Sequence, residues 1–588
     1  MLHGITHDKK LTEQKVNYFL DYFYFFVDQV GVLDGFDMET YASLCKKILF
    51  QIENNKKTPE KYVGQYFSHP VFEDRSRIKG YTGYTKILKL RKQFFQFGEK
   101  AFDAKRAFIT NDEFVNAFSK FADGLRTKMF KSSLEEIISF LKCTHQLEFH
   151  LDDLIYHTKI LASSLISTRD SKKEVQAITR RIFSKQLYEY PFPRNYKRMS
   201  AETKRKYLAN SNFDKQFGGI YNALMERFDA HWLMFRITDI ISKNDFEFTY
   251  NQVTFINPEN EKFDRVKKNL QRKGMLTDFF NGKDFLIAMV NLGQNTRNSA
   301  VKVAKKMIDS ELTYFNNCLG STGILDRKSF LYTSNFSATG GIVSMTGNKY
   351  EIGKYDIESL KNNPYSHMQG DDQIKSHFLK YEPFFVKAMH TESMSDYWHY
   401  IEVLLQNNKT STNNNQIIGI LSDILLLNAD STNKQFIREY ISETLSSFQT
   451  SAKQWGLTPE RQNEFNRLAY TKEGIDLAVL KSEIKHKFAL DLIDMHDRPF
   501  TVNTAEQIQK HYKHVLWDAQ AQRNSYLHAA VLDPVSTVSL GFIFPRLLMK
   551  FRWILLANRR KYSTLSFRDY ILQLQKDATA LKNNLPQK

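Results

Sequence analysis

The residues between Thr504 and Pro534 carry the strongest local signal of one long helix. Thr504 followed by Gln507 has the spacing of a capping box, and Asp533 before Pro534 marks a stop, because the proline ring disfavours helical backbone in the residue before it. Between these signals, apolar side chains recur at steps of three and four, namely Tyr512, Leu516, Ala519, Tyr526 and Ala530. The pattern predicts an amphipathic helix with one face against a core.

Arg523 falls on this apolar stripe. A guanidinium group among core positions is costly unless it is paired or faces a cavity, so its position there indicates a functional residue. Asn524 and His528 are one helical turn apart on a common face, whereas Arg523 lies roughly 140° from His528. Two such helices, packed antiparallel across a symmetric dimer, would bring both sets of side chains to one cleft.

The run Arg523-Asn524-x-x-x-His528 resembles the signature of the HEPN superfamily of ribonucleases, most of all its Apea-like group in abortive-infection and other phage-defence proteins. The likeness extends to the helical region around the motif. It implies a C-terminal four-helix bundle, a homodimer with a shared site, and metal-independent RNA cleavage without a cofactor. In the branch regulated by adenylylation, a tyrosine follows the motif histidine by two residues. Here that position is Ala530, so this form of control is not expected.

The resemblance assigns a role to each motif residue. His528 would take a proton from a ribose 2′-hydroxyl or give one to the leaving 5′-oxygen, because imidazole titrates at about pH 6.5. Arg523 would hold the scissile phosphate and stabilise charge on it, and Asn524 would orient the imidazole or the phosphate. Attack by a 2′-hydroxyl needs no metal and cannot occur on DNA.

Length and charge limit the class of protein. A chain of 588 residues predicts two or three domains, and a net charge of +18 favours a polyanion, whether RNA, DNA or an anionic membrane. The cysteines, Cys45, Cys143 and Cys318, form no C-x-x-C pair, which fits a cytoplasmic protein. The N-terminus lacks the order of a signal peptide, and the apolar stretch 535–556 contains Pro545 and several cations, so no membrane span is expected.

Two tracts interleave cations with aromatic rings, a composition that suits nucleic-acid binding but also a solvated face with its rings turned inward. The first runs from Lys86 to Arg106 and includes Phe94, Phe95 and Lys105. The second, 180–206, contains two prolines typical of an exposed loop. Its candidate nucleic-acid-binding residues are Arg194, Lys197, Arg198, Lys204 and Arg205. Near the C-terminus, Arg552, Arg559 and Arg560 either extend a positive cleft or are ordinary solvated charges.

The predicted fold is mainly α, with a helical sensor or regulatory region at 1–245, a mixed region at 246–430 and a HEPN-like helical domain at 431–588. The mixed region is expected to hold a β-hairpin around Asn251-Gln252, helices between Glu261 and Phe315, and a glycine-rich β insertion at 320–353. A cluster at Cys143, His145, His150, Asp153 and His157 lacks a second pair with typical metal-ligand spacing, so no metal site is expected.

The resemblance to HEPN ribonucleases implies a regulated antiphage endoribonuclease with RNA as substrate, a phage-derived trigger and a homodimer as its active form, and the positive charge is consistent with this. Two alternatives remain open at this point. One is a nucleic-acid-binding module in which Arg523 and His528 are structural, and the other is a scaffold whose positive charge is incidental. The first predicts that His528→Ala leaves RNA affinity unchanged, and the second predicts weak RNA affinity even at low salt.

Overall fold

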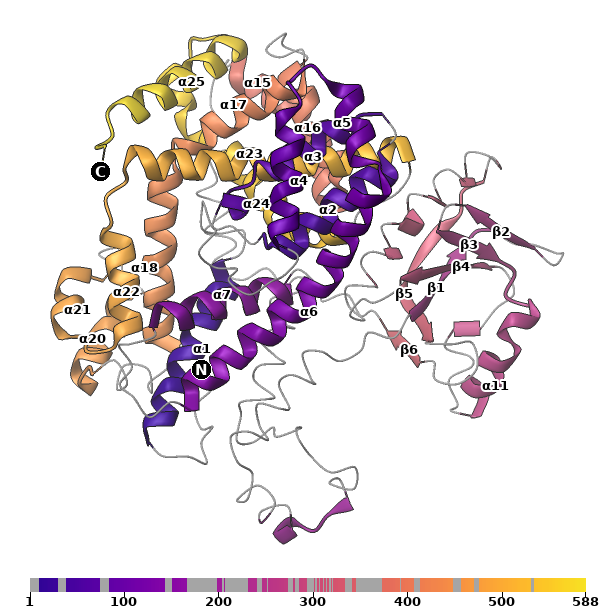
Figure 1. Cartoon of the computed structure of the whole chain (residues 1–588), viewed down its shortest axis with the longest axis horizontal. Helices are drawn as coiled ribbons and strands as arrows, with labels where there is room; N and C mark the ends of the chain where they lie inside the picture. Colours follow the sequence, from indigo (N-terminus) through magenta and orange to yellow (C-terminus); the bar gives the residue numbers. More distant parts are fainter. Residues whose placement is uncertain are drawn as a thin grey trace.

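The structure is a computed structural model of the chain. It describes the residues 10–29, 39–55, 57–73, 84–142, 151–166, 198–203, 206, 231–240, 246–250, 252–272, 279–280, 285–292, 301, 304–305, 307–309, 311–312, 315–316, 319, 321–333, 341–344, 373–391, 393–406, 413–447, 456–469, 475–529 and 534–587. The protein is mainly α-helical and carries one small sheet beside the helical body (Figure 1), as the sequence predicts.

The helices before the sheet form two groups. Their bounds are α1 (Lys10–Gln29), α2 (Tyr41–Asn54), α3 (Pro59–Phe67), α4 (Tyr84–Gln96), α5 (Phe102–Ile109), α6 (Asp112–Lys142) and α7 (Leu151–Ile166), with a 3-10 turn η1 (Pro70–Glu73). Helix α2 begins at a capping box in which Thr40 and Ser43 each bond the backbone N–H of the other. Helices α2 to α6 share a core rich in aromatic rings, whereas α1 and α7 pack on the second half of α6 and on later helices.

The sheet contains six antiparallel strands in the order β2-β3-β4-β1-β5-β6. Their bounds are β1 (His231–Thr238), β2 (Glu247–Tyr250), β3 (Val253–Ile256), β4 (Phe285–Leu292), β5 (Ile324–Thr333) and β6 (Gly341–Ser344). Along β1, Leu233 and Phe235 face one core while Met234 faces the other. The second core lies under α11 (Asp264–Arg272), which follows the 3-10 turn η5 (Glu261–Phe263). Both faces of the sheet are therefore covered.

The predicted hairpin is confirmed as β2 and β3, and strands β5 and β6 lie in the predicted glycine-rich insertion. Two expectations need correction. Strand β4 occupies part of the region predicted to be helical, and β1 lies before the predicted boundary at residue 246. Both are inner strands, buried on two faces, so they read as continuous apolar runs rather than as alternating patterns.

The helices after the sheet divide between two cores. Their bounds are α15 (Gln373–Thr391), α16 (Met394–Gln406), α17 (Asn414–Leu426), α18 (Ala429–Ser447), α20 (Pro459–Ala469), α21 (Leu477–Glu483), α22 (Lys487–Asp497), α23 (Val502–Ala529), α24 (Pro534–Asn558) and α25 (Phe567–Asn583), with η6 (Arg559–Tyr562). Helices α15 to α17 pack with α23, α24 and α25, whereas α18 and α20 to α22 pack with α1 and α7. The cores therefore cross the predicted boundary at 430/431, and helices at 373–426 help to enclose the motif helix.

The motif helix, α23, begins slightly earlier than the sequence predicts. Thr501, not Thr504, supplies the cap, because its hydroxyl accepts the N–H of Thr504 at 3.2 Å. The helix ends at Ala529, and Pro534 takes the first position of α24, where its missing N–H costs nothing. The predicted stripe is buried at Tyr512, Leu516 and Ala519, while Ala530 lies outside the described residues.

Asp21 of α1 is buried beside His486, with 3.8 Å between Asp21 Oδ2 and His486 Nε2. Burial raises the pKa of the Asp21 carboxyl to about 8 and lowers the pKa of the His486 imidazole to about 4. Both groups are then neutral in the folded protein near pH 7. The proton on Asp21 contributes stability that is fully present below the ordinary carboxyl pKa and is lost as pH rises through about 8.

We expect Asp21→Asn to remove this pH dependence. Between pH 6.5 and 8 the wild type should lose up to about 2 kcal/mol that the variant keeps, because protonation of His486 in the unfolded chain affects both proteins equally. Thermal unfolding across this range measures the difference, with Asp497→Asn as a control because the Asp497 side chain is 48% exposed. Parallel stability profiles for wild type and Asp21→Asn would mean that Asp21 is already ionised in the folded protein at these pH values and would overturn the raised pKa.

Candidate functional site

Helix α23 carries all three motif positions near its C-terminal end. Position 528 follows Asn524 by one turn, so the two share a face, although the structure describes only the backbone of His528. The side chains of Arg523 and Asn524 are half-buried, and Arg523 Nη1 donates to Asn524 Oδ1 at 3.3 Å. The structure therefore brings Arg523 and Asn524 together within one chain, although the sequence analysis places Arg523 partly away from the face of Asn524 and His528.

Glu402 of α16 fixes the Arg523 guanidinium through an ion pair of 2.9 Å between Arg523 Nη2 and Glu402 Oε2. The other carboxylate oxygen, Oε1, accepts the indole N–H of Trp398 at 3.1 Å. Arg523 Nε is buried and has no hydrogen-bond partner among the described residues. The guanidinium thus keeps one unused donor in a buried position, where a hydrogen-bond acceptor that reached it would stabilise it.

Asn524 connects the motif to the N-terminal helices. Its amide Nδ2 donates to the hydroxyl of Tyr62 on α3 at 2.6 Å. Burial raises the pKa of Tyr62, against the opposing effects of the Asn524 hydrogen bond and the Arg523 charge, so the hydroxyl remains protonated and neutral. The next residue, Ser525, is buried and accepts from Gln51 of α2 at 3.4 Å.

The sheet also approaches this end of α23. Burial raises the pKa of Tyr526 to about 12, and negative charge at Glu311 and Asp396 adds to the effect, as does Tyr250 of β2. Glu311 belongs to the segment that packs under the sheet, and Asp396 belongs to α16. The N-terminal helices and α16 therefore contact residues 523–525, and groups from the sheet region lie within electrostatic range of Tyr526.

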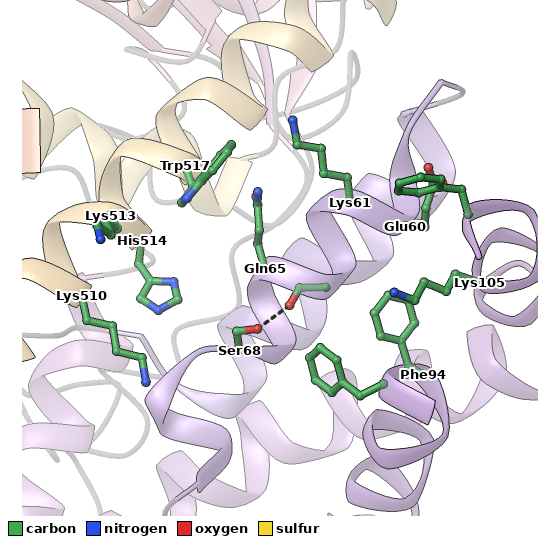
Figure 2. Close-up of a pocket in the computed structure, with 13 residues that line it drawn as sticks. Glu60, Lys61, Gln65, Ser68, Phe94, Lys105, Lys510, Lys513, His514 and Trp517 are labelled. Atoms are coloured by element: carbon green, nitrogen blue, oxygen red, sulfur yellow. Dashed lines mark hydrogen bonds between the residues drawn. The ribbon is translucent and has the colours of Figure 1, made fainter. Parts of the chain in front are cut away.

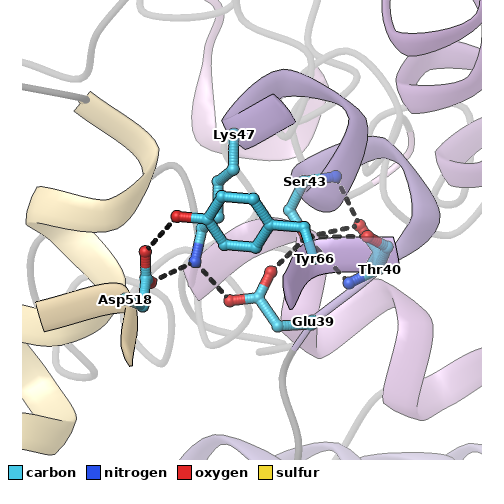
Figure 3. A network of polar contacts seen from close by, with 6 residues as sticks. All are labelled: Glu39, Thr40, Ser43, Lys47, Tyr66 and Asp518. Carbon is cyan, nitrogen blue, oxygen red and sulfur yellow. Dashed lines mark hydrogen bonds and ion pairs between the residues drawn. The ribbon is translucent and has the colours of Figure 1, made fainter. Parts of the chain in front are cut away.

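A buried ion network lies behind the motif, about one and a half turns earlier on α23 (Figure 3). Lys47 of α2 is 1% exposed, and its ammonium lies 2.5 Å from Asp518 Oδ2 and 2.6 Å from Glu39 Oε1. Tyr66 of α3 donates to Asp518 Oδ1 at 2.9 Å. Burial lowers the pKa of Lys47, but the two carboxylates outweigh it and hold that pKa above its ordinary value. The cation is therefore permanently charged and ties α2 and α3 to α23.

The structure corrects the predicted nucleic-acid surface near the C-terminus. Arg552 is 4% exposed, pairs with Glu382 at 2.8 Å, and places its guanidinium 3.4 Å from the centroid of the Phe385 ring. Arg559 is also buried. Neither side chain is accessible to a phosphate in this arrangement, and only Arg560 of the three is exposed.

In the second basic tract, Arg198 is exposed in a short 3-10 stretch. Arg194, Lys197, Lys204 and Arg205 lie outside the described residues, so their expected role stays a prediction. Within the described ranges, no cluster of His, Cys, Asp or Glu is arranged to hold a metal ion, and Cys143, His145 and His150 fall outside them.

Sequence reasoning did not find Glu402, Tyr62 or the Lys47 network. Lys47 sits one position from an apolar stripe in α2, and a lysine there is ordinarily a solvated side chain. Tyr62 and Glu402 lie more than a hundred residues from the motif, so no local spacing connects them with it.

None of the described helices has an apolar stretch of the length that crossing a bilayer requires. The sequence matches no protein-family model, and no match was found among curated proteins or solved structures. The role of the motif is therefore inferred from the geometry of its own contacts.

We expect Lys47→Met to destabilise the protein by about 3–5 kcal/mol, because it leaves two carboxylates partly buried without their cation. Urea unfolding at pH 7 measures the loss. The matched control is Lys481→Met, whose ion pair with Asp494 is about half exposed and should contribute little to stability, because solvent screens it. Equal, small losses in both variants would contradict the structural role assigned to Lys47.

Proposed function

We propose that this chain is a regulated, metal-independent endoribonuclease of HEPN type that acts in antiphage defence by abortive infection. One observation carries the proposal. Arg523 and Asn524 lie hydrogen-bonded to each other on α23, one helical turn from position 528, and Arg523 keeps a buried donor without a partner. A guanidinium, an amide and an imidazole thus come from one helix, and one donor of the guanidinium is unpaired.

The proposed reaction is attack of a ribose 2′-oxygen on the adjacent phosphorus. His528 takes the 2′-proton, the bond from phosphorus to the 5′-oxygen breaks, and the His528 imidazolium formed in the first step gives its proton to that oxygen. The products are a 2′,3′-cyclic phosphate and a 5′-hydroxyl. Arg523 would neutralise the charge that gathers on the non-bridging oxygens, and Asn524 would orient the reacting groups.

The contacts around the motif support a resting state that is held inactive. Asn524 is bound to Tyr62 of the N-terminal helices, Arg523 is bound to Glu402, and Tyr526 lies near charges from the sheet. RNA must displace or move these neighbours to reach the Arg523 donor. A phage-derived trigger that loosens α3 from α23 would therefore activate the enzyme, which gives the large N-terminal region a purpose.

The same contacts favour a second candidate, a non-catalytic nucleic-acid-binding protein. In that case the Arg523–Glu402 ion pair and the Asn524–Tyr62 hydrogen bond serve only to join helices. The two candidates differ at His528. Catalysis requires its imidazole, whereas a binding module does not.

We expect purified wild type to cut labelled RNA in EDTA when extract from phage-infected cells is present, and His528→Ala to reduce the rate at least about 100-fold, because proton transfer is lost. Products should carry 2′,3′-cyclic phosphate ends. A substrate with a 2′-deoxy sugar at the cut position should remain intact.

His496→Ala is the matched control, because His496 lies on α22 outside the motif and should keep full activity. Melting temperatures of both variants would exclude unfolding as the cause. Equal cutting by wild type and His528→Ala would reject the assignment of His528. Folded wild type that binds RNA but cuts it under no condition would favour the binding protein.

The shared site also predicts a homodimer through the motif helix. Leu527, one residue before His528, is 51% exposed, and a large apolar side chain beside the motif fits a contact with a second copy. We expect Leu527→Asp to shift the activated protein toward the monomer in analytical ultracentrifugation and to lower RNA cleavage in parallel. Leu572→Asp is the control, since Leu572 is also exposed but lies on α25. An activated wild type that sediments as a monomer would overturn the dimer.

A further inference from the structure

A cleft of about 370 Å³ separates the N-terminal helices α3, α4 and α5 from the first half of α23 (Figure 2). It lies on the helix that carries the motif, but its nearest residue on α23, Trp517, precedes Arg523 by about 9 Å along the helix axis. Its volume falls in the range of small-molecule sites. The cleft is therefore a separate place on the same helix.

Aromatic rings line this cleft from both sides. Phe102 at the start of α5 is 56% exposed and Phe95 of α4 is 45% exposed, which is unusual for rings of this size, and Trp517 of α23 also lines the cleft. Gly64 of α3 lets the Phe94 ring lie close to the helix, because a Cβ there would lie 3.3 Å from Cε1 of Phe94. Such surfaces suit the flat face of an aromatic ligand.

Cations surround the rings. Lys510 and Lys513 extend from α23, Lys61 from α3 and Lys105 from α5. The ammonium of Lys61 lies 5.3 Å from the centroid of the Trp517 ring, and that of Lys105 lies 5.3 Å from the centroid of the Phe94 ring. Glu60 is the only acidic side chain against these four lysines within the described lining. The cleft is thus suited to an anion that also carries a ring.

Glu60 indicates that the ligand carries a hydrogen-bond donor as well as negative charge. Its side chain is 7% exposed, and Oε2 is buried with no hydrogen-bond partner among the described residues. A buried carboxylate oxygen without a donor is costly, so a ligand that offers an N–H or O–H group would stabilise it. Inorganic phosphate and sulfate have few N–H or O–H groups to donate, whereas a nucleotide supplies donors from its ribose or base.

We propose that this cleft binds a nucleotide, with the base against the Phe95, Phe102 and Trp517 rings, the phosphate on the lysines, and a ribose or base donor on Glu60. The nucleotide is either free or part of single-stranded RNA, since both present the same groups. The site does not rest on the proposed ribonuclease activity, because no motif side chain lines it.

The test uses the full-length chain and two probes, a fluorescent N-methylanthraniloyl-ATP and a short fluorescein-labelled single-stranded RNA, read by fluorescence anisotropy. We expect at least one probe to bind, with Lys513→Glu weakening it at least about 10-fold and Phe102→Ala at least about 5-fold. Glu60→Gln should weaken it as well. Lys481→Glu is the matched control, because Lys481 is exposed on α21 outside the cleft, and it should change affinity less than about 2-fold.

The outcomes separate the sources and the alternatives. Tight binding of the ATP probe assigns a free nucleotide, and binding of the RNA probe alone assigns RNA. If Lys513→Glu lowers the affinity for the probe but Phe102→Ala does not, the cleft is only a surface patch that attracts polyanions, and the proposal is overturned. Failure of both probes to bind at low salt would also overturn it. His528→Ala should bind the probes with the same affinity as wild type. The binding result therefore does not depend on whether the protein cleaves RNA.

Discussion

The buried ammonium of Lys47 fixes how the two ends of the chain sit against each other. A lysine that is 1% exposed is tolerated only because Asp518 and Glu39 lie within ion-pair distance. The hydroxyl of Tyr66 donates a hydrogen bond to the other carboxylate oxygen of Asp518. This network sets the alignment of α3 on α23. Tyr62 then meets Asn524, and His69 lies beside His514, with ring centroids 4.6 Å apart. The contacts run in opposite order along the two helices, so α3 and α23 are antiparallel.

This alignment places the motif and the cleft along one interface. Tyr62 binds the motif at Asn524, while the preceding residue, Lys61, reaches over Trp517 in the cleft. A ligand that contacts both α3 and α23 stabilises whichever arrangement of these helices it binds more tightly, and by no more than that difference. The interface is therefore a physical route by which occupancy of the cleft would alter the cover on Arg523 and Asn524.

Local patterns in the sequence predict where helices form, but they do not predict which helices pack against each other. The stripe at Tyr512, Leu516 and Ala519 correctly marks the buried face of α23. The same periodicity says nothing about which helix covers that face, so the assembly of α15 to α17 with α23 to α25 was not foreseen. Strands β1 and β4 were missed because a strand buried on both faces loses the alternation that identifies it.

The sequence likewise indicates some residues of the candidate site but not others. Placing Arg523 and Asn524 together needed only the geometry of one helix, whereas Glu402 and Tyr62 come from distant parts of the chain. Arg552 illustrates the opposite error. Its cationic neighbours in sequence indicate a surface, but Glu382 and the Phe385 ring enclose it. Charge patterns count cations and cannot show which of them a remote carboxylate has already paired.

The state of Arg523 sets a condition on any catalytic form of this protein. Its guanidinium gives one edge to Glu402 and Asn524 and keeps Nε buried, so a phosphate entering from solvent cannot reach the free donor without movement of the surrounding helices. A phosphate and Glu402 are both anions, and their repulsion would be strong at such short separation in a partly buried site. Binding of RNA and retention of the Glu402 ion pair therefore oppose each other. An active form requires Glu402 to withdraw, or a second cation, such as the Arg523 of another copy, to offset its charge.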